Sequence, residues 1–279
     1  MTTHFHGSPI TGGKGSFVAS VAHNGAGAFV SYAHPQQIKV AFESADTVCL
    51  DNGAFSKNNT GRETNWRGFY EEFLPQWIEN EKLRFFVIPD DISGDERLND
   101  QLIEQLPVDL KHKACPVWHM HEPVERLVRL CNEWEYVCIG SSGEYFSIRS
   151  TKWKSRMEEA FLKLYKTGYS AKIHGLRMLD GRVLGNYPLN QADSTNLAIN
   201  VGKFKAKYID LTIEACRMQT HPSKWVSTND PEIAYQTLLK NGGSREEMLG
   251  QRCAVLKQCI ESVKPPTIEE WIAKMKENK

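Results

Sequence analysis

The chain has 279 residues, of which 34 are lysine or arginine and 34 are aspartate or glutamate, so its formal net charge is zero. A chain of this length can bury a large core as one domain, and its balanced charge excludes attraction of nucleic acid or membranes through bulk charge alone. Any contact with nucleic acid must therefore be local.

Short apolar runs alternate with amphipathic stretches along the first 180 residues. The runs predicted as strands are 17–22, 47–50, 84–88, 114–118, 136–139 and 171–176. The stretches predicted as helices, with apolar residues three or four positions apart, include 65–81, 122–134 and 154–168. This alternation predicts parallel βα units, either in an open doubly wound sheet or in a (β/α)8 barrel.

Polar motifs follow the successive runs, all on one side of the strands. They are Asp51, Asp90 with Asp91, His119 with His121, "IGSSGEY" (139–145), "IHGLR" (173–177) and "QADSTN" (191–196). Six motifs at intervals of roughly 20 to 40 residues suit a barrel whose site collects at the carboxyl ends of the strands. An open sheet would concentrate its ligand groups at one switch point. We therefore expect an α/β fold, a (β/α)8 TIM-like barrel.

The chain after Lys203 has a different pattern. A last strand is predicted at 208–217, and helices are predicted at 230–243, 244–263 and 267–278. Thr267 and Glu270 have the spacing of a capping box at the start of the last helix. We expect residues 1–279 to form one domain, with a barrel core at about 15–215 and a C-terminal helical part at about 228–279 packed on it.

Seven cysteines are distributed along the chain without a C-x-x-C pair. Their odd number and apolar surroundings predict reduced core thiols in a reducing compartment. The first residues show no basic region followed by an apolar one, and no run of about 18 apolar residues occurs. We therefore expect a cytoplasmic protein without membrane contact, located in the host cytoplasm if the chain is viral.

The isolated acids at strand ends have more than one interpretation. Asp51 can cap the turn that follows it. Asp90 and Asp91 can bind a metal, cap the next helix, or accept hydrogen bonds from the donors of a base. Asp193 is a second isolated acid at another strand end. Two carboxylates from different strands facing one pocket would suit glycosyl transfer, in which one attacks the sugar and the other moves a proton.

Three histidines allow a metal interpretation as well. His119 and His121 are two positions apart, which places them on the same face of a strand, and His174 follows a later strand. Imidazoles near carboxylates are common zinc or iron ligands, but polar packing or ligand stacking accounts for them equally. A metal-dependent hydrolase that uses Asp51, His119, His121 and Asp193 is therefore one alternative, while our main expectation is that the protein uses no metal and no cofactor.

The ordered motifs "LDNGAF", "PDD", "GSSGE", "HGL" and "ADSTN" resemble those of the tRNA-guanine transglycosylase superfamily. The resemblance is greatest to its DNA-modifying branch, the DpdA-type enzymes of phages and bacterial modification clusters, and covers roughly residues 15 to 200. It implies a pentosyltransferase on a (β/α)8 barrel that exchanges guanine in DNA for a 7-deazaguanine such as preQ0. The exchange would proceed through a covalent enzyme–sugar intermediate, without breaking the chain.

The resemblance also implies roles for individual residues. Asp193 matches the nucleophile that attacks the sugar C1′, and Asp51 matches the general acid/base. In the implied substrate-binding set, Phe55 stacks on the base, and Asp90 or Asp91 reads the guanine edge. The base-binding loop is formed by Gly140, Ser141 and Glu144, and the set also includes His119 and His174. His119 stands where the family usually has a glutamine that contacts the base, and His174 stands where a residue covers the second face of the base.

The expected partners are DNA and the free 7-deazaguanine base, with tRNA as the alternative polymer. Zinc-binding cysteines near the C-terminus, which the tRNA enzymes of the family carry, are not expected here, because Cys253 and Cys259 have no third partner beside them. Local basic stretches at 148–156 and 202–207 could follow a phosphate backbone. The sequence is compatible with a homodimer. An alternative of another class is a catalytically silent subunit that binds nucleic acid for an active homologue.

Overall fold

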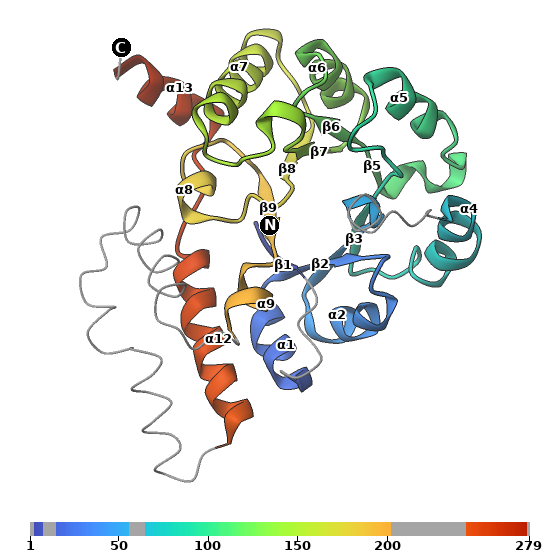
Figure 1. Ribbon diagram of the computed structural model, residues 1–279, viewed down its shortest axis with the longest axis vertical. Helices are drawn as coiled ribbons and strands as arrows, with labels where there is room; N and C mark the ends of the chain where they lie inside the picture. Colours follow the sequence, from blue (N-terminus) through green and yellow to red (C-terminus); the bar gives the residue numbers. More distant parts are fainter. Residues whose placement is uncertain (1–2, 8–14, 56–64, 202–243, 278–279) are drawn as a thin grey trace.

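The computed structural model describes residues 3–7, 15–55, 65–201 and 244–277, and in them nine parallel strands form a nearly closed barrel surrounded by helices (Figure 1). The strands are β1 His4–Gly7, β2 Gly27–Ser31, β3 Thr47–Asp51, β4 Leu83–Val87, β5 Ala114–Cys115, β6 Val117–His119, β7 Tyr136–Gly140, β8 Lys172–Gly175 and β9 Gln191–Ser194. Consecutive strands pair with one another, except for β5 and β6, and β9 returns to pair with β1. The predicted α/β barrel is confirmed.

The segments β5 and β6 are two halves of one barrel strand, interrupted at Pro116. β5 pairs with β4, whereas β6 pairs with β7. Proline has no N–H to donate, so one ladder hydrogen bond is missing at this residue. The carbonyl of Pro116 accepts from the backbone N–H of Cys138 at 2.9 Å. Counted as one strand, β5 and β6 complete the eight strands of a (β/α)8 barrel.

Helices follow the strands and cover the outside of the barrel (Figure 1). The α-helices are α1 Gly15–His23, α2 Ile38–Ser44, α4 Trp66–Gly68, α5 Glu96–Glu104, α6 Val124–Glu133, α7 Thr151–Thr167, α8 Gly181–Leu184, α9 Asn196–Asn200, α12 Arg245–Glu261 and α13 Ile268–Glu277. The shorter helical turns are η1 Pro35–Gln37, η2 Phe69–Phe73, η3 Leu74–Gln76, η4 Val108–Lys113 and η5 Gly143–Tyr145. Buried residues of α6 and α7 recur three or four positions apart, as the sequence predicted.

Two predicted elements were wrong, and two strands were not predicted. Residues 17–22 form part of α1 rather than a strand, because a short apolar run does not distinguish a buried helix from a buried strand. The barrel begins at β1, before the expected residue 15, and its first two strands were not predicted. The predicted helix at 65–81 is divided into α4, η2 and η3, where Pro75 lies at the start of η3.

The C-terminal helices pack on the barrel where they are described. α12 contacts α1, and α13 contacts α7. The predicted capping box is confirmed, since Thr267 Oγ1 accepts from Glu270 N at 3.2 Å and a Glu270 carboxylate oxygen accepts from Thr267 N at 2.8 Å. The strand predicted at 208–217 and the helix predicted at 230–243 lie outside the described residues.

The barrel interior is filled by a compact apolar cluster. It consists of Phe5, Phe29, Cys49, Phe85, Val87, Cys115, Val117 and Cys138. Six of the seven cysteines lie in the described residues, and all six are buried free thiols, as predicted. Burial raises the pKa of the Cys49 and Cys138 thiols, which keeps them protonated and unreactive.

None of the helices in the described part of the chain is both long and apolar enough to cross a lipid bilayer.

Candidate functional site

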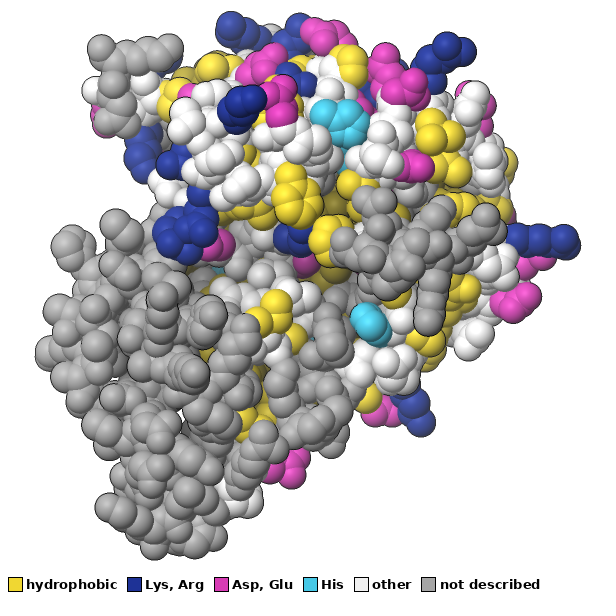
Figure 2. Space-filling model, in the orientation of Figure 1, with side chains coloured by type: hydrophobic (Ala, Val, Ile, Leu, Met, Phe, Trp, Pro, Cys, Tyr) yellow, Lys and Arg dark blue, Asp and Glu magenta, His cyan; other side chains and the backbone are white. Residues whose placement is uncertain are grey.

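A cavity of about 330 Å³ lies at the carboxyl ends of the barrel strands. Its polar or small lining residues at or just after strand ends are Gly7, Ser31, Asp51, Asp90, His119, Gly140, Ser141, Arg177 and Asp193. In the view of Figure 2 the centre of the molecule is hollowed, and both acidic and basic side chains show inside the hollow. Residues from the strand-end motifs therefore lie together at one mouth of the barrel, as the sequence predicted.

Asp51 is the last residue of β3 and lies half-buried in the cavity wall. Gly53, at φ +84°, forms the turn behind it and donates its N–H to Asp51 Oδ2 at 3.1 Å. Burial raises the pKa of Asp51 to about 6, a hydrogen bond from Ser31 opposes that rise, and the negative charges of Asp90 and Asp193 add to it. A carboxyl group with this pKa can donate or accept a proton near neutral pH.

Asp193, in β9, is a buried carboxylate, and the described residues provide hydrogen-bond donors to one of its two oxygens. Its Oδ1 accepts from the backbone N–H of Arg177 at 3.0 Å and lies 3.1 Å from His174 Nε2. Within the described residues no hydrogen bond reaches Oδ2, although the side chain lines the cavity. One oxygen is therefore fixed, and the other is available to a ligand.

His174 lies beneath Asp193 and does not line the cavity. Its ring is fully buried, is stacked on Phe29 at a centroid distance of 5.0 Å, and meets Phe5 and Phe85 edge-on. In the tautomer with the ring proton on Nε2, His174 donates to the Asp193 carboxylate. The position expected to cover the second face of a base is thus occupied by a residue that orients Asp193.

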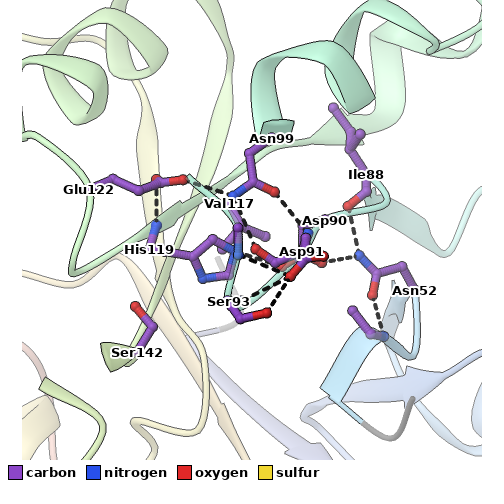
Figure 3. A network of polar contacts seen from close by, with 12 residues as sticks. Asn52, Ile88, Asp90, Asp91, Ser93, Asn99, Val117, His119, Glu122 and Ser142 are labelled. Carbon is purple, nitrogen blue, oxygen red and sulfur yellow. Dashed lines mark hydrogen bonds and ion pairs between the residues drawn. The ribbon is translucent and has the colours of Figure 1, made fainter. Parts of the chain in front are cut away.

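Of the two adjacent acids after β4, only Asp90 lines the cavity. Its Oδ1 accepts from the buried Asn52 Nδ2 at 2.5 Å, and its Oδ2 lies 2.8 Å from His119 Nε2 (Figure 3). The latter contact has an ion-pair distance without the alignment of a hydrogen bond, so neither ring nitrogen of His119 has a hydrogen-bond partner among the described residues. Asp91 instead closes its own loop, accepting from Ser93 and Gly94.

A buried polar network holds the loop of Asp90 and Asp91 against the end of β6 (Figure 3). The side chain of Asn99 accepts from Asp91 N at 2.8 Å and donates to Glu122 Oε1 at 2.8 Å. Glu122 Oε2 accepts from His119 N at 2.9 Å and from Arg126 Nη1 at 2.8 Å. The network connects the backbones that carry two cavity residues, so it fixes their relative positions.

Replacing Glu122 with leucine is expected to lower the free energy of unfolding by about 3 kcal/mol, because the buried Arg126 loses a partner and Asn99 loses an acceptor. Urea denaturation monitored by fluorescence measures the change. Glu125→Leu, in the first turn of α6 and three residues after Glu122, is the matched control, since its pair with Lys163 is exposed and is expected to contribute nothing measurable. Equal effects of the two variants would contradict the structural role of the network.

The remaining predicted binding residues lie in different surroundings. Gly140 and Ser141 line the cavity, and a Cβ on Gly140 would come within 3.3 Å of His119 Nδ1, so the small residue permits this close packing. Phe55, which is 38% exposed, also lines it. Glu144 does not, because it is exposed and pairs with Lys152 at 2.6 Å.

The metal alternative has little geometric support. Both ring nitrogens of His121 are engaged, Nδ1 with Ser142 Oγ at 2.7 Å and Nε2 with the carbonyl of Gly94 at 2.9 Å. Among the residues that the structure describes, no group of three or more His, Cys, Asp or Glu side chains could hold a metal ion. The four residues of the hydrolase alternative therefore do not form a ligand set.

Arg177 is a cavity residue that the sequence analysis did not single out. Its guanidinium lies over the rings of Phe55 and Phe146, 4.5 and 4.9 Å from their centroids. The only signal in the sequence was its place in "IHGLR", directly after a strand. Asn52 was also missed, although it stands beside Asp51 at the end of a strand.

The chain matches no family model, no curated protein and no solved structure, so the function is argued from the site and the sequence motifs.

Proposed function

We propose that this protein is a guanine transglycosylase, a pentosyltransferase that exchanges guanine in DNA for a 7-deazaguanine base such as preQ0. The observation that carries the proposal is the pair of carboxylates in one cavity: Asp51, whose pKa is raised to about 6, and Asp193, whose Oδ2 has no hydrogen-bond partner among the described residues. Glycosyl transfer needs one acid that moves a proton and another that attacks the sugar carbon. The motifs that resemble the transglycosylases assign these roles to the same two residues.

The proposed reaction has two half-reactions at one site. Asp193 Oδ2 attacks C1′ on the face opposite the base, forming an ester while the C1′–N bond breaks, and Asp51 donates a proton to the departing guanine. The incoming 7-deazaguanine then loses a proton to Asp51 and attacks C1′, which releases Asp193. Two inversions restore the original configuration, and no phosphodiester bond is broken.

The residues around this pair suit recognition of a flat, donor-bearing base. The ring of Phe55 lines the cavity and can stack on a base. Asp90 accepts from Asn52 and faces the same space, where a carboxylate can accept from the ring N–H and the exocyclic amine of guanine. A target in a duplex would have to be flipped out to reach the cavity.

Asp90→Ala is expected to weaken binding of free guanine and preQ0 by 1 to 3 kcal/mol, because the donors of the base are left unpaired in a buried site. Calorimetric titration of each base measures the loss. Asp91→Ala is the matched control: it removes the adjacent acid, which closes its own loop outside the cavity, and it should leave base affinity unchanged. Unchanged affinity in Asp90→Ala would show that Asp90 does not read the base.

The proposed activity is tested by incubating the protein with labelled guanine and, separately, DNA and tRNA. Label incorporated into DNA supports the proposal, whereas label in tRNA alone would move the activity to that polymer. Incorporation into neither polymer would contradict base exchange and favour the catalytically silent binding subunit. Mass spectrometry of nucleosides from cells that express the protein then identifies the inserted base.

A further inference from the structure

Arg177 supplies a positive charge at the cavity that the proposed reaction does not use. It is the one lysine or arginine among the described residues that line the cavity, and three carboxylates, Asp51, Asp90 and Asp193, line the same space. A polyanionic chain that approaches these carboxylates is repelled unless a cation lies nearby. Arg177 is therefore the residue best placed to compensate the charge of an entering phosphate.

The guanidinium of Arg177 is positioned by aromatic rings rather than by an acid. It lies over Phe55 and over the exposed Phe146, and its Nη2 makes a 3.4 Å hydrogen bond to the carbonyl of Ser141. No carboxylate forms an ion pair with Arg177 within the part of the chain that the structure describes. The charge of Asp193 acts on the Arg177 guanidinium from a distance, but the described residues include no ion-pair partner for it. A half-buried guanidinium stacked on rings in this way has the properties of an anion-binding group.

The main chain of Arg177 connects this cation to the proposed nucleophile. The residue has φ +61°, a left-handed conformation that a residue other than glycine seldom adopts. In this conformation its N–H donates to Asp193 Oδ1 at 3.0 Å, while its side chain reaches Phe55 and Phe146. One residue thus contacts both the Asp193 carboxylate and the aromatic rings of Phe55 and Phe146.

We propose that the guanidinium of Arg177 binds a phosphodiester group next to the target nucleotide. In a nucleotide bound with C1′ at Asp193, the flanking phosphates are only a few bonds from the reacting carbon, and a guanidinium can donate two parallel hydrogen bonds to phosphate oxygens. The contact selects a nucleotide within a chain over a free nucleoside or base. This inference rests on the proposed function, since it takes Asp193 as the group at C1′.

The test combines a change in the protein with a change in the nucleic acid. The probe is a fluorescent single strand of about 12 nucleotides with one guanine, in which the linkage on either side of that guanine is a phosphodiester or a neutral methylphosphonate. We expect wild-type protein to bind roughly tenfold more weakly when one of the two linkages is neutral. Arg177→Met should bind the strand with phosphodiester linkages roughly tenfold more weakly than wild type does. Its affinity should not fall further when one linkage is neutral.

Two further variants make the result specific. Arg129→Met removes an equal charge from the outer face of α6, where Arg129 pairs with Asp100, and should behave as wild type. Arg177→Lys keeps the charge but not the two-pronged geometry, so it should retain a smaller sensitivity to the neutral linkage. Full sensitivity in Arg177→Met, or a wild-type protein indifferent to both neutral linkages, would overturn the inference.

Exchange of labelled guanine on the same strand separates this inference from the proposed function. If guanine is exchanged but Arg177→Met remains as sensitive to the neutral linkage as wild type, the phosphate contact alone is overturned. If Arg177→Met loses its sensitivity to the neutral linkage but no guanine is exchanged, the phosphate site stands and the enzymatic proposal is contradicted. An RNA strand with the same modifications shows which polymer supplies the phosphodiester.

Discussion

Asp193→Asn is expected to lose base exchange by a factor on the order of 10⁴ or more, together with the covalent intermediate. Asparagine keeps an oxygen that can accept from the N–H of Arg177, so β9 should fold normally. It lacks the anionic oxygen that attacks C1′. The measurement incubates protein with DNA in the absence of free guanine, followed by rapid denaturation. Wild type should show a slow-migrating protein–DNA adduct that added guanine or preQ0 discharges.

The matched control for this variant is Asp180→Asn. Asp180 is a nearby half-buried acid that caps α8 and pairs with Arg182, and it does not line the cavity. It should form the adduct as wild type does. An adduct that persists in Asp193→Ala, or one that maps to Asp51, would reverse the two roles, and exchange without any adduct would contradict the covalent mechanism.

Asp51→Asn is expected to reduce exchange by 10²- to 10⁴-fold, the usual contribution of a proton-transfer group. Because burial raises the pKa of Asp51 to about 6, the wild-type exchange rate should change with pH around that value. The asparagine variant should lack this pH dependence. Exchange rates measured between pH 5 and pH 8 test the assignment, and an unchanged profile in the variant would assign the titration to another group.

The same variant has a second readout in protein stability. The pKa of Asp51 in the folded protein, about 6, lies above its ordinary value of 3.8, so the folded state gains stability from this group below pH 3.8 and loses it as the pH rises through 6. Asp51→Asn should therefore exceed wild type in free energy of unfolding above pH 6, by on the order of 1 to 3 kcal/mol, and match it near pH 3.5. Urea denaturation at the two pH values measures the difference. Burial lowers the pKa of His6 and His23, but both proteins share that effect and it cancels.

The barrel was predictable because its buried parallel strands have continuous apolar sequences. β3, β4 and β7 lie within one residue of the predicted runs. β1 was missed because HFHG has a single apolar residue between two histidines, and β2 was missed although GAFVS contains three consecutive apolar residues. They are strands because neighbouring strands pair with them on both sides, and a sequence pattern does not record that pairing.

The sequence by itself determined which acids stand at strand ends, and in a parallel barrel that suffices to bring Asp51, Asp90 and Asp193 to one mouth. Only the tertiary structure decided what each side chain does there. It placed Asp90 in the cavity and turned Asp91 into its own loop, and it put His174 beneath Asp193. The physical reason is that side-chain direction and hydrogen-bond partners depend on strand register and loop path, which join residues far apart in the chain.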